Sequence, residues 1–333
     1  MFEPLAATQT NNFGVDVSRA DPNDQRRSCV NTGPVALNVY QTVRCNLACT
    51  FCLLQHAGVE SAPDVNVTLL TKVLRQYPSI RSATIAGFGE PLMSRDVWPN
   101  ILYLKDKDRY VGLITNGALL PCQYSEFLPT RPHHVNISLN AADETEHAET
   151  MRSKAGDFAK ALAAIDIVSE LRIRTIVSFV ITRANYERIP DYVHVATKYG
   201  ATEVALINLL PTHGNSYTNS QYFWDNVIQD VDHHILSRME LYRQYSWAKS
   251  VSVWPQPISR QHCPSLCDSP FVSIGVDGRG FVSGCRRVEP PNWNGGRVEE
   301  GWNSLPLTDA RESLLGNAPL TDKCLMCFGN WRP

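Results

Sequence analysis

Short apolar segments and helix-like segments alternate along most of this 333-residue chain. Six segments of buried-strand type recur between Val35 and Ile207, and stretches with helical spacing of apolar residues separate them. Strands that alternate with helices of this length form βαβ units, which build a parallel sheet, so the pattern predicts an α/β fold. The expected strands cover 35–39, 83–86, 110–114, 135–139, 175–181 and 204–207, and the expected helices cover 67–74, 96–106, 156–171 and 187–199.

Composition limits the classes of protein that the chain can belong to. It is 43% hydrophobic and 19% charged, which suits one sizeable globular domain with a small appendage. The formal net charge is −2 and both signs are interspersed, so the sequence does not favour nucleic acid as a partner. No apolar stretch approaches the roughly 18 residues of a membrane span. The start lacks the pattern of a signal peptide, and we expect a soluble, cytoplasmic protein.

Cysteines gather in three groups, at 45–52, 263–285 and 324–327, with only Cys29 and Cys122 isolated. Disulfides are not expected in a cytosolic chain of this length, so metal ligation explains the grouping better. In the first group, Cys45, Cys49 and Cys52 follow a C-x3-C-x2-C pattern with an aromatic residue before the third cysteine. Three such thiolates can hold three irons of a [4Fe-4S] cluster and leave the fourth iron open to a small molecule. The alternatives are buried structural cysteines or zinc, which normally takes four ligands in two separated pairs.

This cysteine pattern resembles that of the radical S-adenosylmethionine (SAM) superfamily. The resemblance implies a partial (β/α)6 barrel and a [4Fe-4S] cluster on Cys45, Cys49 and Cys52. It also implies that the amine and carboxylate of SAM chelate the open iron. Reductive cleavage of SAM, with electrons from a flavodoxin- or ferredoxin-type reductant, would then release a 5'-deoxyadenosyl radical that abstracts hydrogen from carbon. Ligands of parallel sheets gather at the carboxyl ends of the strands, where the cysteine loop also falls.

A turn after the second strand resembles the G-G-E-P motif that binds the amine of SAM in this superfamily. Its glycines let the backbone approach a ligand closely, and Glu90 offers a carboxylate to an ammonium group. Phe88 departs from the family pattern, and an ordinary strand-to-helix turn is the alternative. The residues expected to contact SAM here are Gly87, Gly89, Glu90 and Pro91.

Polar residues at the ends of later strands resemble further SAM-contacting positions. A Thr-Asn-Gly turn follows the third strand, and hydroxyl or amide side chains sit at the fourth and fifth strands. Each could instead be a turn former or a satisfied polar group of the barrel. The stretch 206–211 is expected to pass beside the adenine. The expected contacts are Thr115, Asn116, Ser138, Asn140 and, as a weaker candidate, Ser178.

The C-terminal cysteines resemble the auxiliary-cluster domains called SPASM and twitch. Cys267 is followed by twelve residues, Gly280, four residues and Cys285, and Cys324 and Cys327 form a C-x2-C pair. Four thiolates could ligate a second [4Fe-4S] cluster, although a four-thiolate zinc site is the alternative. Turn residues at 277–280 predict a β-hairpin between 271–274 and 281–283.

The expected organisation has four parts. Residues 1–37 form an arm or cap, 38–215 the partial barrel, 216–250 a helical connection with one long helix over 217–247, and 251–333 the twitch-type domain. Cys263 is spare: it could be silent, an alternative ligand, or a hydrogen-atom donor like the thiol that some radical SAM epimerases use. Cys29 and Cys122 receive no functional role.

The resemblance suggests, as the leading hypothesis, hydrogen abstraction from a carbinol or amine-bearing carbon of a small polar natural-product intermediate, sugar or aminocyclitol-like. Oxidation would follow with help from the auxiliary cluster. One alternative is an epimerase in which Cys263 quenches the substrate radical. Another is modification of a ribosomal peptide by Cα epimerisation or cross-linking, although residues 1–37 are short for a peptide-recognition module. The alternative from another class is a non-enzymatic iron–sulfur carrier or scaffold.

Overall fold

Six consecutive βα units form the centre of the structure. The computed structural model describes residues 33–56, 61–209, 220–258, 269–284 and 296–317. Nine strands form one sheet in the order β7-β6-β5-β4-β3-β2-β1-β8-β9, parallel throughout except for the antiparallel pair β8 and β9. The strands are β1 Ala36–Tyr40, β2 Ser82–Ala86, β3 Tyr110–Thr115, β4 His134–Ser138, β5 Arg174–Ile181, β6 Glu203–Asn208, β7 Val251–Val253, β8 Ser273–Asp277 and β9 Val282–Ser283.

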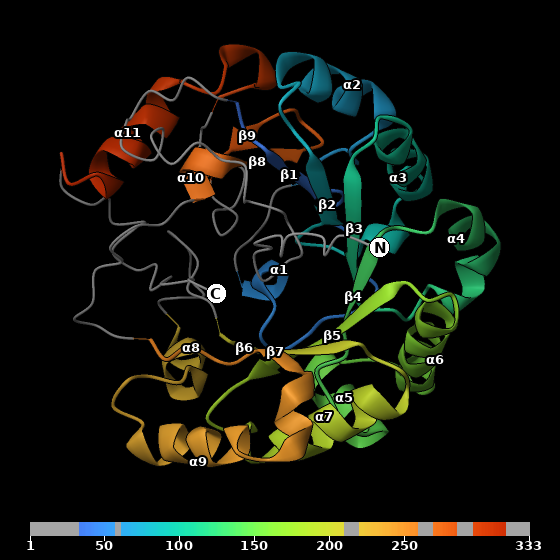
Figure 1. The fold of residues 1–333 in the computed structure, drawn as a ribbon, viewed down its shortest axis with the longest axis vertical. Helices are drawn as coiled ribbons and strands as arrows, with labels where there is room; N and C mark the ends of the chain where they lie inside the picture. Colours follow the sequence, from blue (N-terminus) through green and yellow to red (C-terminus); the bar gives the residue numbers. More distant parts are fainter. Residues whose placement is uncertain (1–32, 57–60, 210–219, 259–268, 285–295, 318–333) are drawn as a thin grey trace, which may run out of the picture.

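The sheet curves, and most helices lie on its outer side (Figure 1). Strands β1 to β6 occupy the six predicted positions within a few residues, and four of the helices match the predicted ones. The α/β partial-barrel fold is therefore confirmed. The helices are α1 Leu53–His56, α2 Val67–Gln76, α3 Val97–Asp106, α4 Tyr124–Thr130, α5 Glu144–Met151, α6 Asp157–Glu170, α7 Ile189–Lys198, α8 Gln221–Asn226, α9 His233–Arg243, α10 Ser269–Val272 and α11 Leu305–Leu314.

Local sequence explains where the barrel helices begin. The Asn66 side chain accepts a hydrogen bond from Leu69 N (3.0 Å) at the start of α2, and Asp143 accepts one from Glu146 N (2.9 Å) at the start of α5. These side chains satisfy amide groups that have no partner within the helix. The strands are buried almost throughout, as expected for a parallel sheet that is covered on both faces.

The C-terminal part of the chain extends the barrel sheet. Strand β8 lies parallel to β1, with Ala36 opposite Ser273. At Gly275 an added Cβ would lie 2.6 Å from the Tyr40 ring, so glycine is required for this close approach. The predicted hairpin is confirmed as the β8–β9 pair, although residues 271–272 belong to α10. Sequence patterns alone did not indicate that this hairpin joins β1, or that both parts share one hydrophobic core.

The prediction of a single long helix over 217–247 was wrong. The described part of this region is divided into α8, α9 and a 3-10 helix over Ser246–Ser250. Between α8 and α9, the backbone of Ile228 is engaged by Asn208: its N–H donates to Asn208 Oδ1 (3.1 Å) and its carbonyl accepts from Asn208 Nδ2 (2.9 Å). These tertiary hydrogen bonds compete with helical ones, and the helix ends before them.

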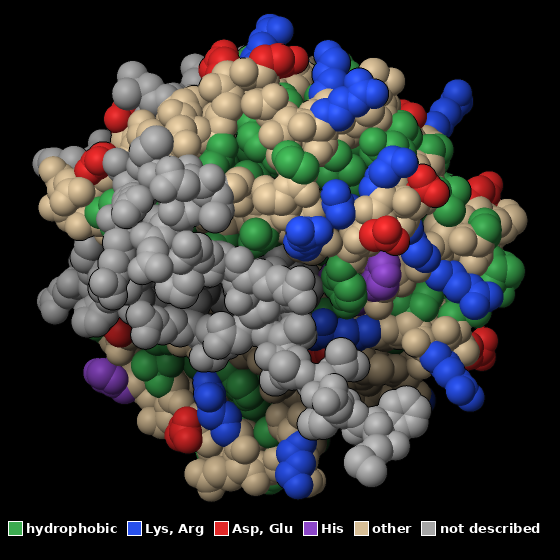
Figure 2. Space-filling model, turned by 45° about the horizontal axis from the view of Figure 1, so that its top comes forward, with side chains coloured by type: hydrophobic (Ala, Val, Ile, Leu, Met, Phe, Trp, Pro, Cys, Tyr) green, Lys and Arg blue, Asp and Glu red, His purple; other side chains and the backbone are tan. Residues whose placement is uncertain are grey.

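Two sequence expectations concern the surface. No helix in the described part of the chain is both long and apolar enough to cross a membrane. On the face in Figure 2, basic and acidic side chains are interspersed, and no continuous basic stripe crosses the described part of that face. Most of the expected N-terminal arm, residues 1–32, lies outside the described residues. The four-part domain division stays a prediction.

Candidate functional site

The cysteine loop leaves β1 at the carboxyl end of the sheet. Cys45, Cys49 and Cys52 are all free thiols, and each is partly exposed. The loop is tightly turned, since Cys52 N donates to Cys49 O (3.0 Å), and α1 starts directly after Cys52. Leu47 N points at Cys45 Sγ across 3.4 Å. The three sequence-predicted ligands are therefore brought together on one loop at the expected edge of the sheet.

The electrostatics of the three thiols suit a cationic ligand. Burial, together with the nearby charges of Glu90 and Cys52, raises the pKa of Cys45 to about 11. Burial also raises the pKa values of Cys49 and Cys52, and at Cys49 the charges of the other two cysteines add to the shift. Thiolates are the ligating form, so a metal centre here would have to replace their protons. The donor set and its position fit an iron–sulfur cluster of the expected kind.

A cluster and a single metal ion make different geometric demands. In the described ranges of the chain, no three His, Cys, Asp or Glu side chains converge closely enough to hold one metal ion. Each cysteine of a [4Fe-4S] cluster binds its own iron, so these ligands need not converge on one point.

A buried amide pair holds the base of the cysteine loop. Gln41 and Asn100 are both fully buried. Gln41 Nε2 donates to the carbonyl of Val65 (2.8 Å) and to Ser94 Oγ (2.9 Å), and Asn100 Nδ2 donates to Gln41 Oε1 (2.9 Å) and the same carbonyl (2.8 Å). Gln41 precedes the loop and Val65 follows it, so both ends are fixed at one place. No sequence pattern predicts this pair, because nothing local links positions 41 and 100.

The glycine-rich turn after β2 lies against the start of the cysteine loop. Gly89 N donates to Thr42 O (3.1 Å) and Glu90 N donates to Arg44 O (2.8 Å). A Cβ at Gly89 would lie only 2.2 Å from the Arg44 carbonyl oxygen, whereas one at Gly87 would lie 3.0 Å from that of Thr42. Glycine is thus required where the two loops meet.

Phe88, which departs from the family pattern, has an aromatic partner. Its ring stacks on Tyr40 at the end of β1, with 5.2 Å between centroids and 14° between planes. The same Tyr40 ring packs over Gly275 of β8. The aromatic substitution therefore connects the glycine-rich turn to two neighbouring strands of the sheet.

The Glu90 carboxylate is 3% exposed and accepts three hydrogen bonds from the chain. Leu92 N (3.0 Å) and Thr115 Oγ1 (2.6 Å) donate to Oε1, and Asn116 N (2.7 Å) donates to Oε2. Burial raises the pKa of Glu90, although these hydrogen bonds act in the opposite direction. Most of the acceptor capacity of this side chain is used within the protein, and Glu90 therefore fixes the turn after β2 to the turn after β3.

The Thr115–Asn116 turn also reaches the cysteine loop. Asn116 Nδ2 donates to Asn46 Oδ1 (2.9 Å), so the turn contacts both neighbouring loops. Asn46 was missed in the sequence analysis, although it lies directly after Cys45. The polar character of Asn46 was the only local sign of a role in the site. Its partner, Asn116, could be identified only from the folded structure.

The polar residues of β4 and β5 differ in how accessible they are. Ser138 and Ser178 lie opposite each other in register, with their hydroxyl oxygens 3.4 Å apart. Ser138 is partly exposed and Ser178 is 6% exposed. Asn140 is 5% exposed and its amide is engaged on both sides: Oδ1 accepts from Val180 N (2.8 Å) and Nδ2 points at Met151 Sδ (3.4 Å). Of the expected ribose contacts, Ser138 is thus the most available.

Helix α8 borders the cysteine loop on the side of β5 and β6. The Tyr222 hydroxyl donates to Thr50 Oγ1 (3.3 Å), and Phe51 packs against the apolar cluster that contains Phe223. Leu209, at the start of the stretch expected near the adenine, belongs to the same cluster, whereas residues 210–211 lie outside the described residues.

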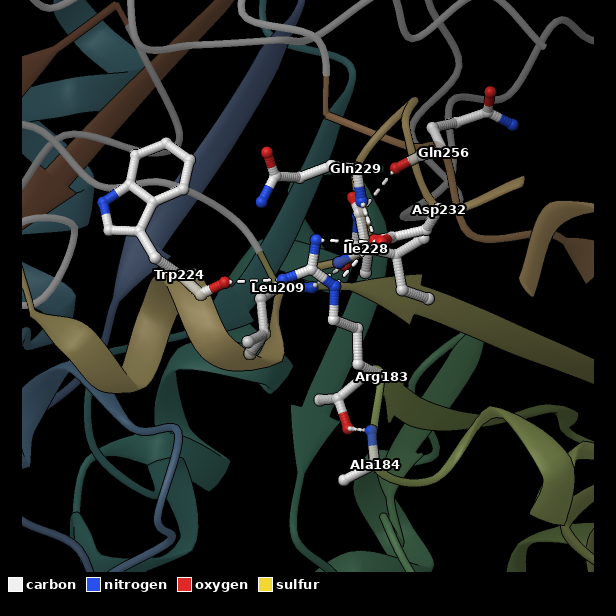
Figure 3. Close-up of polar contacts among 10 residues, drawn as sticks. Arg183, Ala184, Leu209, Trp224, Ile228, Gln229, Asp232 and Gln256 are labelled. Atoms are coloured by element: carbon white, nitrogen blue, oxygen red, sulfur yellow. Dashed lines mark hydrogen bonds and ion pairs between the residues drawn. The ribbon is translucent and has the colours of Figure 1, made fainter. Parts of the chain in front are cut away.

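An ion pair anchors α8 to the end of β5 (Figure 3). Arg183 donates from Nε and Nη2 to the Asp232 carboxylate (2.7 and 2.9 Å) and from Nη1 to the Trp224 carbonyl (2.8 Å). Burial alone would raise the pKa of Asp232, but the hydrogen bonds from Arg183 and Gln229 N lower it overall. This bidentate pair therefore holds the segment between α8 and α9 in place.

The C-terminal cysteines are not part of the described structure. The five residues singled out there, as cluster ligands or hydrogen donor, fall in ranges whose placement is not described: Cys263, Cys267, Cys285, Cys324 and Cys327. The β8–β9 hairpin that precedes Cys285 is described and has the expected form. The role of Cys267, Cys285, Cys324 and Cys327 as cluster ligands stays a prediction.

Comparisons with known proteins agree with this site. The family described as the radical SAM superfamily matches residues 39–196. A PqqA peptide cyclase from Granulibacter bethesdensis is 26% identical over 181 residues, which are 53% of this chain and 47% of the relative. A probable GTP 3',8-cyclase from Sulfolobus acidocaldarius is 26% identical over 179 residues, which are 53% of this chain and 56% of the relative. The aligned part thus spans about half the length of these curated relatives.

Among solved structures, SuiB from Streptococcus suis with bound S-adenosylmethionine has a TM-score of 0.65 at 17% identity. The match covers 89% of this chain and 71% of SuiB. This likeness supports the fold. The match to the family model identifies residues 39–196 as a radical SAM domain.

The contact between the glycine-rich turn and the cysteine loop generates the first prediction. Gly89→Ala places a Cβ against the Arg44 backbone and should destabilise the protein by about 1–3 kcal/mol and lower the iron content after anaerobic reconstitution. Gly87→Ala, with a clearance of 3.0 Å, should have a smaller effect on both. Iron analysis and chemical denaturation measure these quantities. Equal effects of the two substitutions would contradict the packing argument.

The Arg183–Asp232 pair generates a prediction on pH. The lowered pKa of Asp232 adds stability above its unfolded value of about 3.9, and this contribution disappears as pH falls below that value. Arg183→Gln should therefore reduce the unfolding free energy near pH 7 by about 1–3 kcal/mol, and the deficit should shrink in acid. Urea denaturation of both proteins between pH 3 and pH 7 tests this.

A solvent-exposed pair provides the matched control. Lys72 Nζ lies 3.9 Å from Glu299, and both side chains are more than 60% exposed. Lys72→Gln should change the unfolding free energy by less than about 1 kcal/mol. A deficit for Arg183→Gln that is no larger than this, or that grows in acid, would show that the pair does not anchor α8.

Proposed function

We propose that this chain is a SAM-dependent radical enzyme that activates a C–H bond of a peptide substrate. The observation that carries the proposal is the meeting of three loops at one edge of the sheet. The cysteine loop after β1, the glycine-rich turn after β2 and the Thr-Asn-Gly turn after β3 are joined by Glu90 and Asn46. A cluster on Cys45, Cys49 and Cys52 would supply the electron for reductive cleavage of SAM.

The roles of the chain's own residues follow from their accessibility. The turn 87–90 presents backbone groups next to the cysteine loop, where the amine of SAM would bind. Glu90 holds that turn in place and keeps part of one oxygen's acceptor capacity for the ammonium group. Ser138, partly exposed at the end of β4, is the best placed hydroxyl for the ribose, and Ser178 supports it from β5. A flavodoxin- or ferredoxin-type protein is the proposed reductant.

Similarity to peptide-modifying proteins supports a peptide as the substrate class. The Granulibacter relative is a PqqA peptide cyclase, and SuiB has also been solved with its precursor peptide SuiA. The match to SuiB covers 89% of this chain and therefore includes most of the barrel that holds the site described above. The reaction class that we favour is modification of a ribosomal peptide, by Cα epimerisation or by formation of a cross-link.

A small polar metabolite is the second candidate substrate, and the similarity to a probable GTP 3',8-cyclase favours it. In this version the enzyme abstracts hydrogen from a carbinol or amine-bearing carbon of a sugar or aminocyclitol-like molecule. A second cluster, on Cys267, Cys285, Cys324 and Cys327, would accept the second electron of the oxidation. An epimerase would instead return a hydrogen atom to the substrate radical, with Cys263 as the proposed donor.

Cofactor content tests the proposal before any substrate is known. Anaerobic reconstitution should give about eight irons per chain if both cysteine groups hold [4Fe-4S] clusters, and SAM with a strong reductant should yield 5'-deoxyadenosine. Cys49→Ala should abolish 5'-deoxyadenosine formation, whereas Cys122→Ala, at an exposed cysteine outside the loop, should not. Formation of 5'-deoxyadenosine by the Cys49→Ala variant would contradict the proposal. About four irons with one zinc would leave the first site intact and make the C-terminal cysteines a structural zinc site.

Substrate class and reaction can then be separated. A peptide substrate predicts that a co-expressed small precursor peptide changes mass, or gains deuterium in D2O, only when SAM and the enzyme are present. If the reaction is epimerisation, one Cα should take up deuterium and Cys263→Ala should prevent it. Dehydrogenation would show neither effect. Turnover of polar metabolites with no peptide modified would favour the second candidate instead.

A further inference from the structure

The last residue of α5, Met151, lies directly against the cysteine loop. Its Sδ is 3.3 Å from the Sγ of Cys49, and the side chain is only 2% exposed. The two residues are about a hundred positions apart in the sequence. Methionine is a flexible, polarizable side chain with no hydrogen to donate, so Cys49 meets an apolar surface on this side.

The backbone of α5 fixes the same part of the loop. Ala48 N donates to the Met151 carbonyl (3.3 Å), and Thr50 N donates to the Thr150 carbonyl (2.9 Å). The carbonyls of the last helical turn have no partners within a helix, and Arg152, with φ of 48°, ends α5 at this point. The residues on both sides of Cys49 are therefore held by the end of α5, which brings the Cys49 sulfur to Met151.

Asn140 contacts the same sulfur atom of Met151. Its φ of 54° is left-handed, a conformation that asparagine tolerates better than most residues. Asn140 Oδ1 accepts from Val180 N (2.8 Å), and Nδ2 points at Met151 Sδ (3.4 Å). A chain of contacts therefore runs from β5 through Asn140 and Met151 to the sulfur of Cys49.

We propose that Met151 is a positioning residue that shields the Cys49 thiolate and thereby sets the reduction potential of the cluster. The inference rests on the proposed function, because it needs a cluster on Cys45, Cys49 and Cys52. Hydrogen bonds to the ligand sulfurs and exposure to solvent both tune the potential of an iron–sulfur cluster. A thioether that excludes donors and water keeps the potential low, as a strongly reducing cluster requires.

The test compares variants of Met151 in the reconstituted full-length protein. Met151→Leu keeps the volume and the apolar surface, and its midpoint potential should match the wild type. Met151→Gln places an amide donor beside Cys49, and Met151→Ser admits water. Each should favour the reduced cluster by about tenfold at a fixed potential, which is about 59 mV for a one-electron couple. Redox titration, followed by the electron paramagnetic resonance signal that changes on adding SAM, measures this for the first cluster alone.

The outcomes separate this inference from the proposed function. Wild-type iron content and 5'-deoxyadenosine formation test the function, and they are measured first. If these hold, a positive shift in every donor variant that retains its cluster supports the role of Met151, as does loss of the cluster in both donor variants while Met151→Leu keeps it. Wild-type potentials in any donor variant that retains its cluster would overturn it.

Asn140 provides an independent readout. Asn140→Gly suits the left-handed backbone and removes the amide that holds Met151. The expected result is faster loss of the cluster to a chelator, with SAM affinity unchanged. Weaker SAM binding with unchanged cluster loss would instead make Asn140 a ribose contact, and would remove it from the chain of contacts that positions Met151.

Discussion

The buried carboxylate of Glu90 is the interaction on which the rest of the site depends. It accepts hydrogen bonds from Leu92, Thr115 and Asn116, and its own amide donates to the carbonyl of Arg44 at the entrance to the cysteine loop. A carboxylate that is removed from water is stable only with such partners. The hydrogen bonds that satisfy this charge therefore join the turns after β2 and β3, and the backbone amide of Glu90 joins them to the loop after β1.

The sheet places the remaining parts of the protein around this centre. Strand β8 adds to the free edge of β1, beside the strand that leads into the cysteine loop, and one hydrophobic core runs through both regions. Cys285, a residue of the proposed second metal site, follows β9 by two residues in the sequence and lies outside the described residues. Elsewhere along the loop, Phe51 packs against the apolar cluster that contains Phe223 of α8, and Arg183 anchors this helix through the Trp224 carbonyl.

Sequence patterns predicted the fold well where they are local. Apolar segments and helical spacing located β1 to β6 and four of the helices, because burial on both faces of a parallel sheet leaves a clear apolar signal. The prediction of one long helix over 217–247 was wrong because the side chain of Asn208, a residue of β6, forms two hydrogen bonds with the backbone of Ile228. Asn46, Gln41, Asn100 and Met151 were missed because each acts on a residue of another loop, strand or helix.

By itself the sequence determined the chemistry that this chain can offer: three thiols at fixed spacing, a glycine-rich turn and the strand order that places both at one edge. These are short-range properties, set by neighbouring residues and by the periodicity of burial. The tertiary structure decided how those groups are held. It showed Glu90 bonded within the protein, Asn140 engaged with Met151, and Met151 against Cys49. Such contacts join residues up to about a hundred positions apart, and only the folded chain brings them within bonding distance.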